Sequence, residues 1–389
     1  MTLSRARRGG FASWWWTVDR VALVAMLALI AIGLMLAFAA SPAATGGPMS
    51  AGDFRYAAKQ IAFAVIAAGI LAGTSILNIR TIKLVAAIVF ALAVIGSALV
   101  LFTGNEVLGA KRWIDLGWLT LQPSEFLKPS FAILAATILA DPQPMPVRKE
   151  FITLCLVAFP IAFLLMQPDV GQTGLLLALW ASLLFFAGLR LYWMGLLAGA
   201  GAGLLGFSYA FFPHVRHRID QYWAQMQDPD QAGYQAGLAL KAFEHGGLTG
   251  VGPGAGTIKY RIPDAHSDFI FAVAGEEFGL VLCALIAALF CVLTVRLLLR
   301  ASRARDPFTQ LAGAGLAIVI GLQAFINMGV AISLLPAKGM TLPFISYGGS
   351  SLFAVALTMG FALAVTRQRP QLEMRDNTHN PLPAGVRFA

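Results

Sequence analysis

Apolar segments follow one another along almost the whole chain, and short polar stretches separate them. We place ten such segments at residues 21–40, 57–77, 83–102, 124–140, 151–166, 171–188, 191–212, 268–295, 308–334 and 345–365. Each is close to the roughly 20 apolar residues that a helix needs to cross about 30 Å of hydrocarbon. None shows the alternation that is typical of a membrane β-strand. The pattern predicts an all-α polytopic membrane protein with about ten transmembrane helices.

Charged residues predict the orientation of these helices. With the N-terminus in the cytoplasm, the inner connections and tails hold 17 basic and 6 acidic residues, a net charge of +11. The outer side then holds 11 basic and 13 acidic residues, a net charge of −2. An excess of Lys and Arg marks cytoplasmic connections. We therefore expect N-in/C-in topology, with tails at 1–20 and 367–389, a ten-helix domain at 21–366 and one large extracytoplasmic loop, 213–267, between helices 7 and 8.

Composition excludes several classes of protein. Hydrophobic residues make up 58% of the chain and charged residues 12%, about half of what a soluble domain carries. The net charge of +9 is explained by orientation, so it indicates no nucleic acid partner. Cys155, Cys283 and Cys291 all lie in apolar segments, which argues against a disulfide framework or a zinc site. The short cytoplasmic connections leave no room for an ATPase or kinase domain.

Two polar clusters lie around the start of the fourth segment. The outer loop 103–123 contains Lys111 and Arg112, and the next helix begins with Gln-Pro-Ser-Glu-Phe-Leu-Lys at 122–128. Glu125 and Lys128 are three residues apart, so they share one helical face. One interpretation is an ion pair that hides both charges. The other is a polar site that opens to the outer face, because charges inside a span cost roughly 2.5–3.5 kcal/mol each.

Further polar residues interrupt the later segments. Asp169 follows a Gln-Pro turn, and Lys338 lies in a polar, re-entrant-looking connection at 335–351. Asp268 opens the eighth segment, where it serves either as a helix cap or as a reactive carboxylate. Glu276 and Glu277 are harder to explain as caps, because they lie within an otherwise apolar stretch.

The large loop 213–267 carries its own features. It begins with alternating histidines and arginines that include Arg216 and Arg218, and four of the five histidines of the chain lie in it. Wide spacing favours solvated histidines over a metal site. Residues 234–243 have the spacing of a short helix on the membrane surface. The glycines from 246 to 256 form tight turns or let the backbone approach a ligand.

All of these clusters fall on the outer half of the predicted bundle. This asymmetry favours chemistry or recognition at the outer boundary between membrane and water. A transporter more often places its site near the midplane of the bilayer.

The same motifs, taken in order, resemble the SEDS family (shape, elongation, division and sporulation proteins). The resemblance extends from Asp19 to about Arg369 and rests on these residues: Lys111-Arg112-Trp113-Ile114, the 122–128 motif, Gln167-Pro168-Asp169, Gly246–Gly252, His266–Phe271, Gly275–Gly279 and Ile345–Ser351. The stretch from Pro336 to Phe344 is similar to the division branch of the family.

The resemblance implies a peptidoglycan glycosyltransferase that polymerises lipid II at the outer face of the cytoplasmic membrane. Its important outer aspartate corresponds to Asp268, and its Glu/Lys pair corresponds to Glu125 and Lys128. We expect Asp268 to act as general base. Cations on the outer side would stabilise the lipid-pyrophosphate leaving group; the candidates are Lys111, Arg112, Lys128, Arg216, Arg218 and Lys338. Asp169, Glu276 and Glu277 would hold a divalent cation, Mg²⁺ or Mn²⁺, or orient the basic residues.

The family also implies partners and a location. The partners are a class B penicillin-binding protein and other divisome proteins. The penicillin-binding protein is a transpeptidase that would dock on the eighth and ninth spans. The location is the septum of the inner membrane. Three alternatives stay open: a lipid II flippase or transporter, an elongation role rather than division, and a scaffold that recruits division enzymes.

Overall fold

The computed structural model of the chain describes residues 10–45, 54–107, 110–211, 216, 220, 223, 234–336 and 339–367. In chain order, its elements are α1 (Gly10–Thr17), α2 (Arg20–Thr45), α3 (Arg55–Ile76), α4 (Ile79–Thr103), β1 (Asn105–Val107), β2 (Ala110–Asp115), β3 (Thr120–Leu121), α5 (Pro123–Leu139), α6 (Lys149–Met166), α7 (Val170–Phe186), α8 (Leu191–Phe211), α10 (Tyr234–Gly246), the 3₁₀ helix η1 (Ile258–Arg261), α11 (Ile270–Ser302), α12 (Pro307–Ala331) and α13 (Gly349–Val365).

The predicted apolar segments coincide with helices of the structure. Each of the ten falls on one helix, from α2 to α8 and from α11 to α13. Among the described residues, six helices are long and apolar enough to cross a membrane, and α7 and α13 are shorter apolar helices. The all-α polytopic class is confirmed, whereas the count of ten spans and the N-in/C-in orientation stay predictions.

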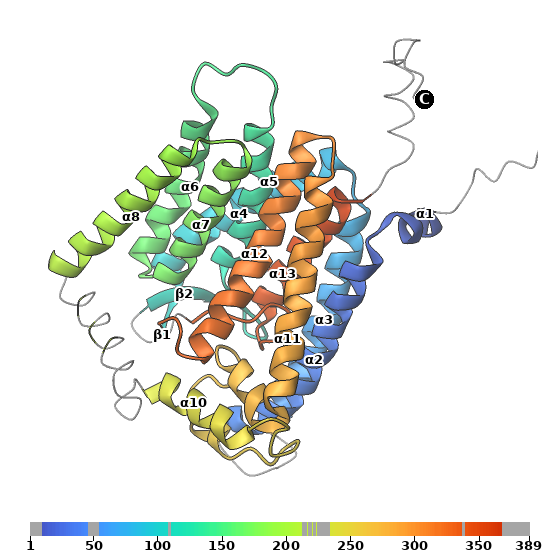
Figure 1. The fold of residues 1–389 in the computed structure, drawn as a ribbon, viewed down its shortest axis with the longest axis vertical. Coiled ribbons are helices and arrows are strands. Elements are labelled where there is room, and N and C mark those ends of the chain that lie inside the picture. The colour runs from blue at the N-terminus through green and yellow to red at the C-terminus, as the bar shows by residue number, and fades with distance from the viewer. Residues whose placement is uncertain are drawn as a thin grey trace, which may run out of the picture.

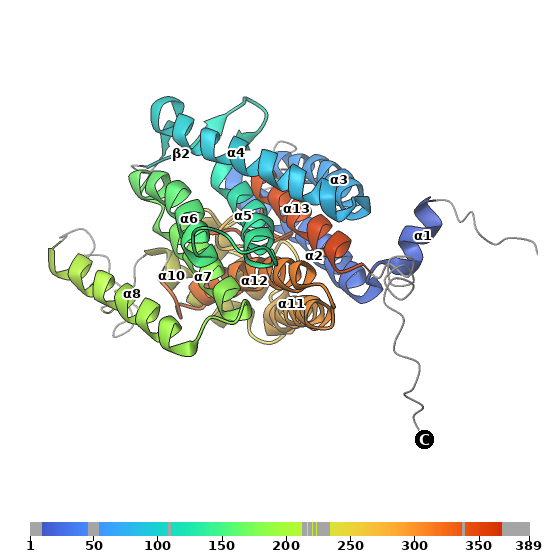
Figure 2. The same cartoon turned by 90° about the horizontal axis from the view of Figure 1, so that it is seen from above.

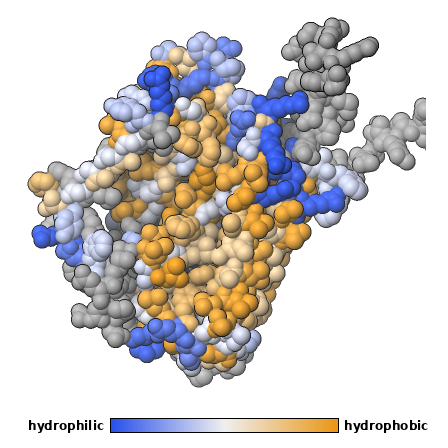
Figure 3. All heavy atoms as spheres, viewed as in Figure 1, coloured by the Kyte–Doolittle hydropathy of each residue, from blue (hydrophilic) through white to orange (hydrophobic). Residues whose placement is uncertain are grey.

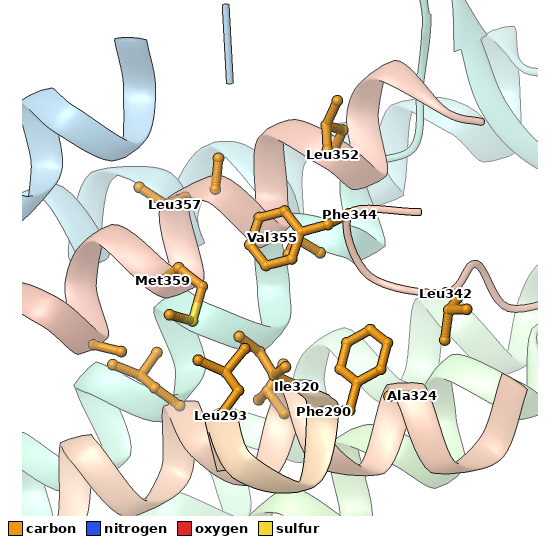
Figure 4. Close-up of a cluster of buried hydrophobic side chains, with 14 of the residues drawn as sticks. Phe290, Leu293, Ile320, Ala324, Leu342, Phe344, Leu352, Val355, Leu357 and Met359 are labelled. Atoms are coloured by element: carbon orange, nitrogen blue, oxygen red, sulfur yellow. The ribbon is translucent and has the colours of Figure 1, made fainter. Parts of the chain in front are cut away.

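The centre of the bundle is the last helix, α13. Every residue from Gly349 to Val365 is buried, and α13 packs against α3, α5 and α12 (Figure 2). Apolar side chains of α11, α12, α13 and the connection before α13 fill the space between them, among them Phe290, Ile320, Phe344 and Met359 (Figure 4). A helix that is apolar on all sides is one that neighbours enclose.

Outward faces of the surrounding helices are apolar as well. Val65, Leu92, Phe102 and Val281 expose more than half of their surface. Apolar residues cover the flank of the molecule, and hydrophilic residues gather at its two ends (Figure 3). This distribution suits a bundle whose flank faces lipid.

The two ends of the bundle differ in structure. At the lower end in Figure 1, α10 and η1 pack against α11, and we predict that this end faces outward. Strands β1, β2 and β3 form an antiparallel sheet within the 103–123 loop, which the sequence analysis did not predict. The short helix predicted at 234–243 is α10, and its location on the membrane surface stays a prediction.

At the opposite end, part of the predicted N-terminal tail, residues 1–20, is folded. Residues 10–17 form α1, and the buried Trp14 donates a hydrogen bond from Nε1 to Ser75 Oγ at 3.0 Å. Residues 1–9 and the C-tail beyond residue 367 lie outside the described residues, as do most positions from 212 to 233.

Candidate functional site

Asp268 lies immediately before α11, beneath the connection that leads into α13. Its backbone N–H donates to Asp264 O at 3.0 Å, and its carbonyl accepts from Asn327 Nδ2 at 2.9 Å. Asn327 also donates to Met340 O at 2.6 Å, so α12 holds both segments in place. Next to Met340, Gly339 lies so close that a Cβ there would be 3.4 Å from Asp268 Oδ2. The carboxylate is therefore enclosed on one side by backbone.

The environment of Asp268 favours its protonated form more than water does. Burial raises its pKa to about 7, the negative charge of Asp264 adds to this rise, and Arg112 opposes it. The residue is nevertheless only partly buried, and it lies at the end of the bundle that we predict to face outward. A largely buried carboxylate with a pKa near neutrality is suited to accept a proton from a bound hydroxyl.

Arg112, whose charge acts on Asp268, lies beside a second carboxylate, Asp169. Strand β2 carries the arginine, whose Nη2 donates to Pro168 O at 2.7 Å and whose Nε lies 4.0 Å from Asp169 Oδ2. Asp169 caps α7 by accepting from Gln172 N at 3.3 Å. Burial raises the pKa of Asp169, and Arg112 partly offsets this effect. The unpredicted sheet thus positions a cation beside Asp169 whose charge also acts on Asp268.

Glu125 and Lys128 form the ion pair that their spacing predicts, and they also belong to a wider network. Lys128 Nζ lies 2.8 Å from Glu125 Oε2 and donates to Gln323 Oε1 at 3.0 Å. Glu125 Oε1 accepts from Gln172 Nε2 at 2.5 Å. All four side chains are buried, and they tie α5 to α7 and α12. The ion pair that hides both charges is confirmed, whereas a site that opens to the outer face stays a prediction.

From Gln323 the network reaches the connection before α13. Gln323 Nε2 donates to Thr341 O at 3.2 Å, and Thr341 Oγ1 lies 2.5 Å from Ser351 Oγ. Residues from α5, α7, α12 and α13 are therefore linked to the segment that covers Asp268. The sequence analysis missed Gln172, Gln323 and Asn327, because a lone amide inside an apolar segment gives no signal of its partner.

Three aromatic rings meet close to the start of α11 and were not predicted. The rings of Tyr56, His266 and Tyr347 have centroids 4.9–5.4 Å apart. Tyr347 N donates to His266 O at 2.9 Å, and Ser346 Oγ donates to Ser267 O at 2.5 Å. Burial lowers the pKa of His266, which favours its neutral form. Segments from α3, the start of α11 and the connection before α13 thus meet at one aromatic cluster, Tyr56–His266–Tyr347.

Glu276 and Glu277 have other partners. Glu276 accepts from the backbone N–H groups of Thr257, Ile258 and Lys259 at 2.7–2.8 Å, and its Oε1 lies 3.0 Å from His245 Nδ1. Glu277 pairs with the buried Lys259. These carboxylates hold the loop after α10 against α11, and their contacts are separate from those of Asp268.

The glycine-rich segment explains why both acids are buried. Helix α11 is broken at Gly279, where φ is +75°. There, Val251 and Gly252 donate to the carbonyls of Glu276 and Glu277, both at 3.0 Å, and Leu280 N donates to Gly247 O. A Cβ on Gly250 would lie 2.2 Å from Glu277 O. At this position the glycine allows close approach to α11 rather than to a ligand.

The remaining predicted cations are spread out. Lys111 lies in β2, partly exposed, and pairs in register with Glu106. Arg216 is exposed, 3.7 Å from Asp220. Arg218 and Lys338 lie outside the described residues. Of the candidate cations that the structure describes, Arg112 and Lys128 are the ones that belong to the polar network of Asp169, Gln172 and Glu125.

The proposed metal ligands do not meet at one point. Asp169 caps α7, whereas Glu276 and Glu277 bind the loop after α10. Within the described ranges, no group of three His, Cys, Asp or Glu side chains is arranged to hold a metal ion. We therefore derive no step of the chemistry through Mg²⁺ or Mn²⁺.

Comparisons with known proteins agree with this arrangement. The family model described as "Cell cycle protein" (FTSW_RODA_SPOVE) matches residues 19–371. A "Probable peptidoglycan glycosyltransferase FtsW" from Caulobacter vibrioides (strain NA1000 / CB15N) is 40% identical over 369 residues, which cover 94% of each chain. The protein of the same name from Alkalilimnicola ehrlichii is 35% identical, over 94% of this chain and 92% of the relative.

Solved structures resemble the fold over most of its length. One comes from the work "Structural coordination of polymerization and crosslinking by a peptidoglycan synthase complex" and has a TM-score of 0.73 at 27% identity, covering 90% of this chain and 98% of the other. The rod shape determining protein RodA from Thermus thermophilus has a TM-score of 0.66 at 26% identity, covering 90% and 97%. Because the family model matches residues 19–371, the chain belongs to the FtsW/RodA/SpoVE family of cell cycle proteins.

Proposed function

We propose that this protein is a peptidoglycan glycosyltransferase that polymerises lipid II at the outer face of the cytoplasmic membrane, at the division septum. The observation that carries the proposal is Asp268, a largely buried carboxylate whose pKa burial raises to about 7, while the positive charge of Arg112 on β2 opposes this rise. The names of the relatives and their coverage support the activity. The division role rests on their naming as FtsW.

In the proposed reaction, the acceptor sugar hydroxyl attacks the anomeric carbon of the donor. Asp268 takes the hydroxyl proton as the new C–O bond forms. The bond from the anomeric carbon to the pyrophosphate oxygen breaks, and its electron pair leaves with the lipid pyrophosphate. A single displacement of this kind inverts the anomeric carbon.

The growing charge of the leaving group needs a cation that is already in position. Arg112 fits this role, because Pro168 O fixes its guanidinium and Asp169 lies beside it. Lys128 is buried against Glu125 and Gln323, so we assign it to positioning. The Tyr56–His266–Tyr347 cluster, whose His266 is two residues before Asp268 in the chain, supplies ring faces and edges that suit the apolar faces of a sugar.

An assay in detergent micelles separates polymerisation from transport. Labelled lipid II is incubated with the purified chain and its transpeptidase partner, and glycan chains are resolved on a gel. A glycosyltransferase forms polymer without any membrane compartment, whereas a flippase leaves lipid II unchanged. If the complex of the chain and its transpeptidase partner forms no polymer, the result would favour the flippase.

The pKa of Asp268 predicts how the rate depends on pH. Below about pH 7 the carboxyl group is protonated and cannot accept a proton, so the rate should rise as pH increases through about 7. Asp264→Asn removes a like charge, lowers the pKa of Asp268 and should shift this rise to lower pH. Asn tolerates the φ of +55° at position 264. Identical pH profiles of the two proteins would contradict this role of Asp264.

We further propose that the membrane helix of a class B penicillin-binding protein docks between α11 and α12. A groove of about 450 Å³ lies there, lined by apolar and small residues that include Ala287, Gly321 and Phe325. Thr294 also lines it, and its buried Oγ1 has no hydrogen-bond partner among the described residues. Small residues and hydroxyls are typical of helix contacts in membranes.

Filling this groove should weaken the complex. Ala287→Trp should lower the amount of transpeptidase that co-purifies with the chain about tenfold. This corresponds to a loss of roughly 1.4 kcal/mol in binding free energy. Ala91→Trp is the matched control, because Ala91 is exposed on α4 and does not line the groove. Unchanged recovery with Ala287→Trp, or equal loss with both variants, would exclude this docking site.

A further inference from the structure

A second cavity, unrelated to Asp268, lies at the opposite end of the bundle. It has a volume of about 430 Å³ and is formed where α5 and α7 end and α6 and α8 begin. We predict that this end, uppermost in Figure 1, faces the cytoplasm. The polar residues that line it are mainly cationic: Arg148, Lys149 and Arg190, with Glu150 as the one carboxylate in the lining.

These cations are only partly neutralised. Arg148 lies 3.5 Å from Glu150, and Lys149 donates to the backbone carbonyl of Asp141. Arg190 has no ion pair with any residue that the structure describes. Three cations and one carboxylate leave the cavity with an excess of positive charge.

The backbone adds to this preference for an anion. Arg148 is the N-cap residue of α6 without a side-chain cap, and Arg190 O accepts from Trp193 N at 2.9 Å in the first turn of α8. Two helices therefore begin at the cavity. Helix N-termini present free N–H groups and the positive end of the helix dipole.

Exposed aromatic residues lie next to the cavity residues. Phe151 follows Glu150, Phe185 and Phe186 precede Gly188, and Tyr192 and Trp193 follow Arg190; all five are exposed. The ring centroids are 5.5 Å apart in Phe185–Phe186 and 5.6 Å apart in Tyr192–Trp193. Aromatic residues of this kind lie at the level of lipid headgroups. A soluble anion would make no use of them.

The positive-inside rule explains why cations lie at this end of the bundle. It does not require a cavity or the five exposed aromatic residues near it, here called the aromatic rim. We propose that the cavity binds the phosphate of an anionic phospholipid of the inner leaflet, with the acyl chains against the aromatic rim. Basic pockets between membrane helices on the cytoplasmic side bind such headgroups. The site is independent of the glycosyltransferase reaction.

The test is lipid binding to the purified full-length chain in detergent, measured by native mass spectrometry. Phosphatidylglycerol is titrated against the wild type, Arg148→Gln/Arg190→Gln and Arg303→Gln/Arg305→Gln. The last variant is the matched control, because Arg303 and Arg305 are exposed between α11 and α12 and do not line the cavity. Phosphatidylcholine and inorganic phosphate are the comparison ligands.

We expect phosphatidylglycerol to bind about 30-fold more weakly to Arg148→Gln/Arg190→Gln and nearly unchanged to the control. Glu150→Gln should tighten binding, a result that a misfolded variant cannot mimic. Equal binding by the wild type and the cavity variant, or equal loss in the control, would overturn the proposal. Displacement of the lipid by millimolar inorganic phosphate would identify a soluble anion as the ligand and reject the phospholipid.

Discussion

Asp268→Asn is expected to lower the rate of lipid II polymerisation by about 10²–10⁴-fold while the protein stays folded. The size of the loss is that of removing a general base. The fold should tolerate the change, because Asn keeps the shape of the side chain and the backbone contacts to Asp264 and Asn327. Burial also disfavours the charge of Asp268, so removing the charge should not destabilise the chain.

The measurement is the initial rate of polymer formation with the partner present, together with the thermal midpoint of unfolding. Asp264→Asn is the control, because it removes a neighbouring carboxylate that is assigned no proton transfer. A near-normal rate for Asp268→Asn would remove Asp268 from the reaction. A low rate accompanied by a fall in the unfolding midpoint would indicate a structural role instead.

Lys259→Met is expected to destabilise the protein by about 3–5 kcal/mol, the cost of leaving a buried charge without its partner. Lys259 and Glu277 are 1% and 0% exposed, and Lys259 Nζ also donates to Ala39 O of α2 at 2.8 Å. The pair thus joins α2, the loop after α10 and α11. Without the lysine, Glu277 remains buried beside a broken stretch of helix.

Two further variants separate charge from packing. Lys259→Met/Glu277→Leu should recover much of the lost stability, because an apolar pair of similar volume often replaces a buried ion pair without loss. Arg148→Met breaks the Arg148–Glu150 pair, in which Arg148 is 72% exposed, and should cost less than about 1 kcal/mol. Unfolding free energies measured in mixed micelles test whether Lys259→Met loses more stability than either the double variant or Arg148→Met. Equal effects of Lys259→Met and Arg148→Met would refute the role assigned to the buried pair.

The sequence predicted the helices well because burial in lipid demands long apolar segments. Helices α6 and α7 illustrate this: only Gln167, Pro168 and Asp169 separate them, as the motif indicated. The contact between Glu125 and Lys128 also followed from their spacing on one face. Such features depend on local periodicity, which a single sequence contains.

Features that depend on distant residues could not be predicted in this way. Gln323 contacts Lys128 across 195 positions, and Gln172 contacts Glu125 across 47. Lys259 lies in the large predicted loop 213–267, where a charged residue is expected to face water. It is nevertheless buried against Glu277. The sheet that carries Arg112 has short strands with no periodic signal. Tertiary contacts decide these cases, so the hydropathy pattern carries no trace of them.

The most direct test of the central claim is the stoichiometry of the reaction in micelles. Purified chain and transpeptidase partner, above pH 7, are given labelled lipid II, and both the glycan polymer and the released lipid pyrophosphate are quantified. Our account predicts one lipid pyrophosphate released for each glycosidic bond formed, and loss of both products in Asp268→Asn. Recovery of intact lipid II from the active complex, or equal amounts of both products from Asp268→Asn, would contradict it.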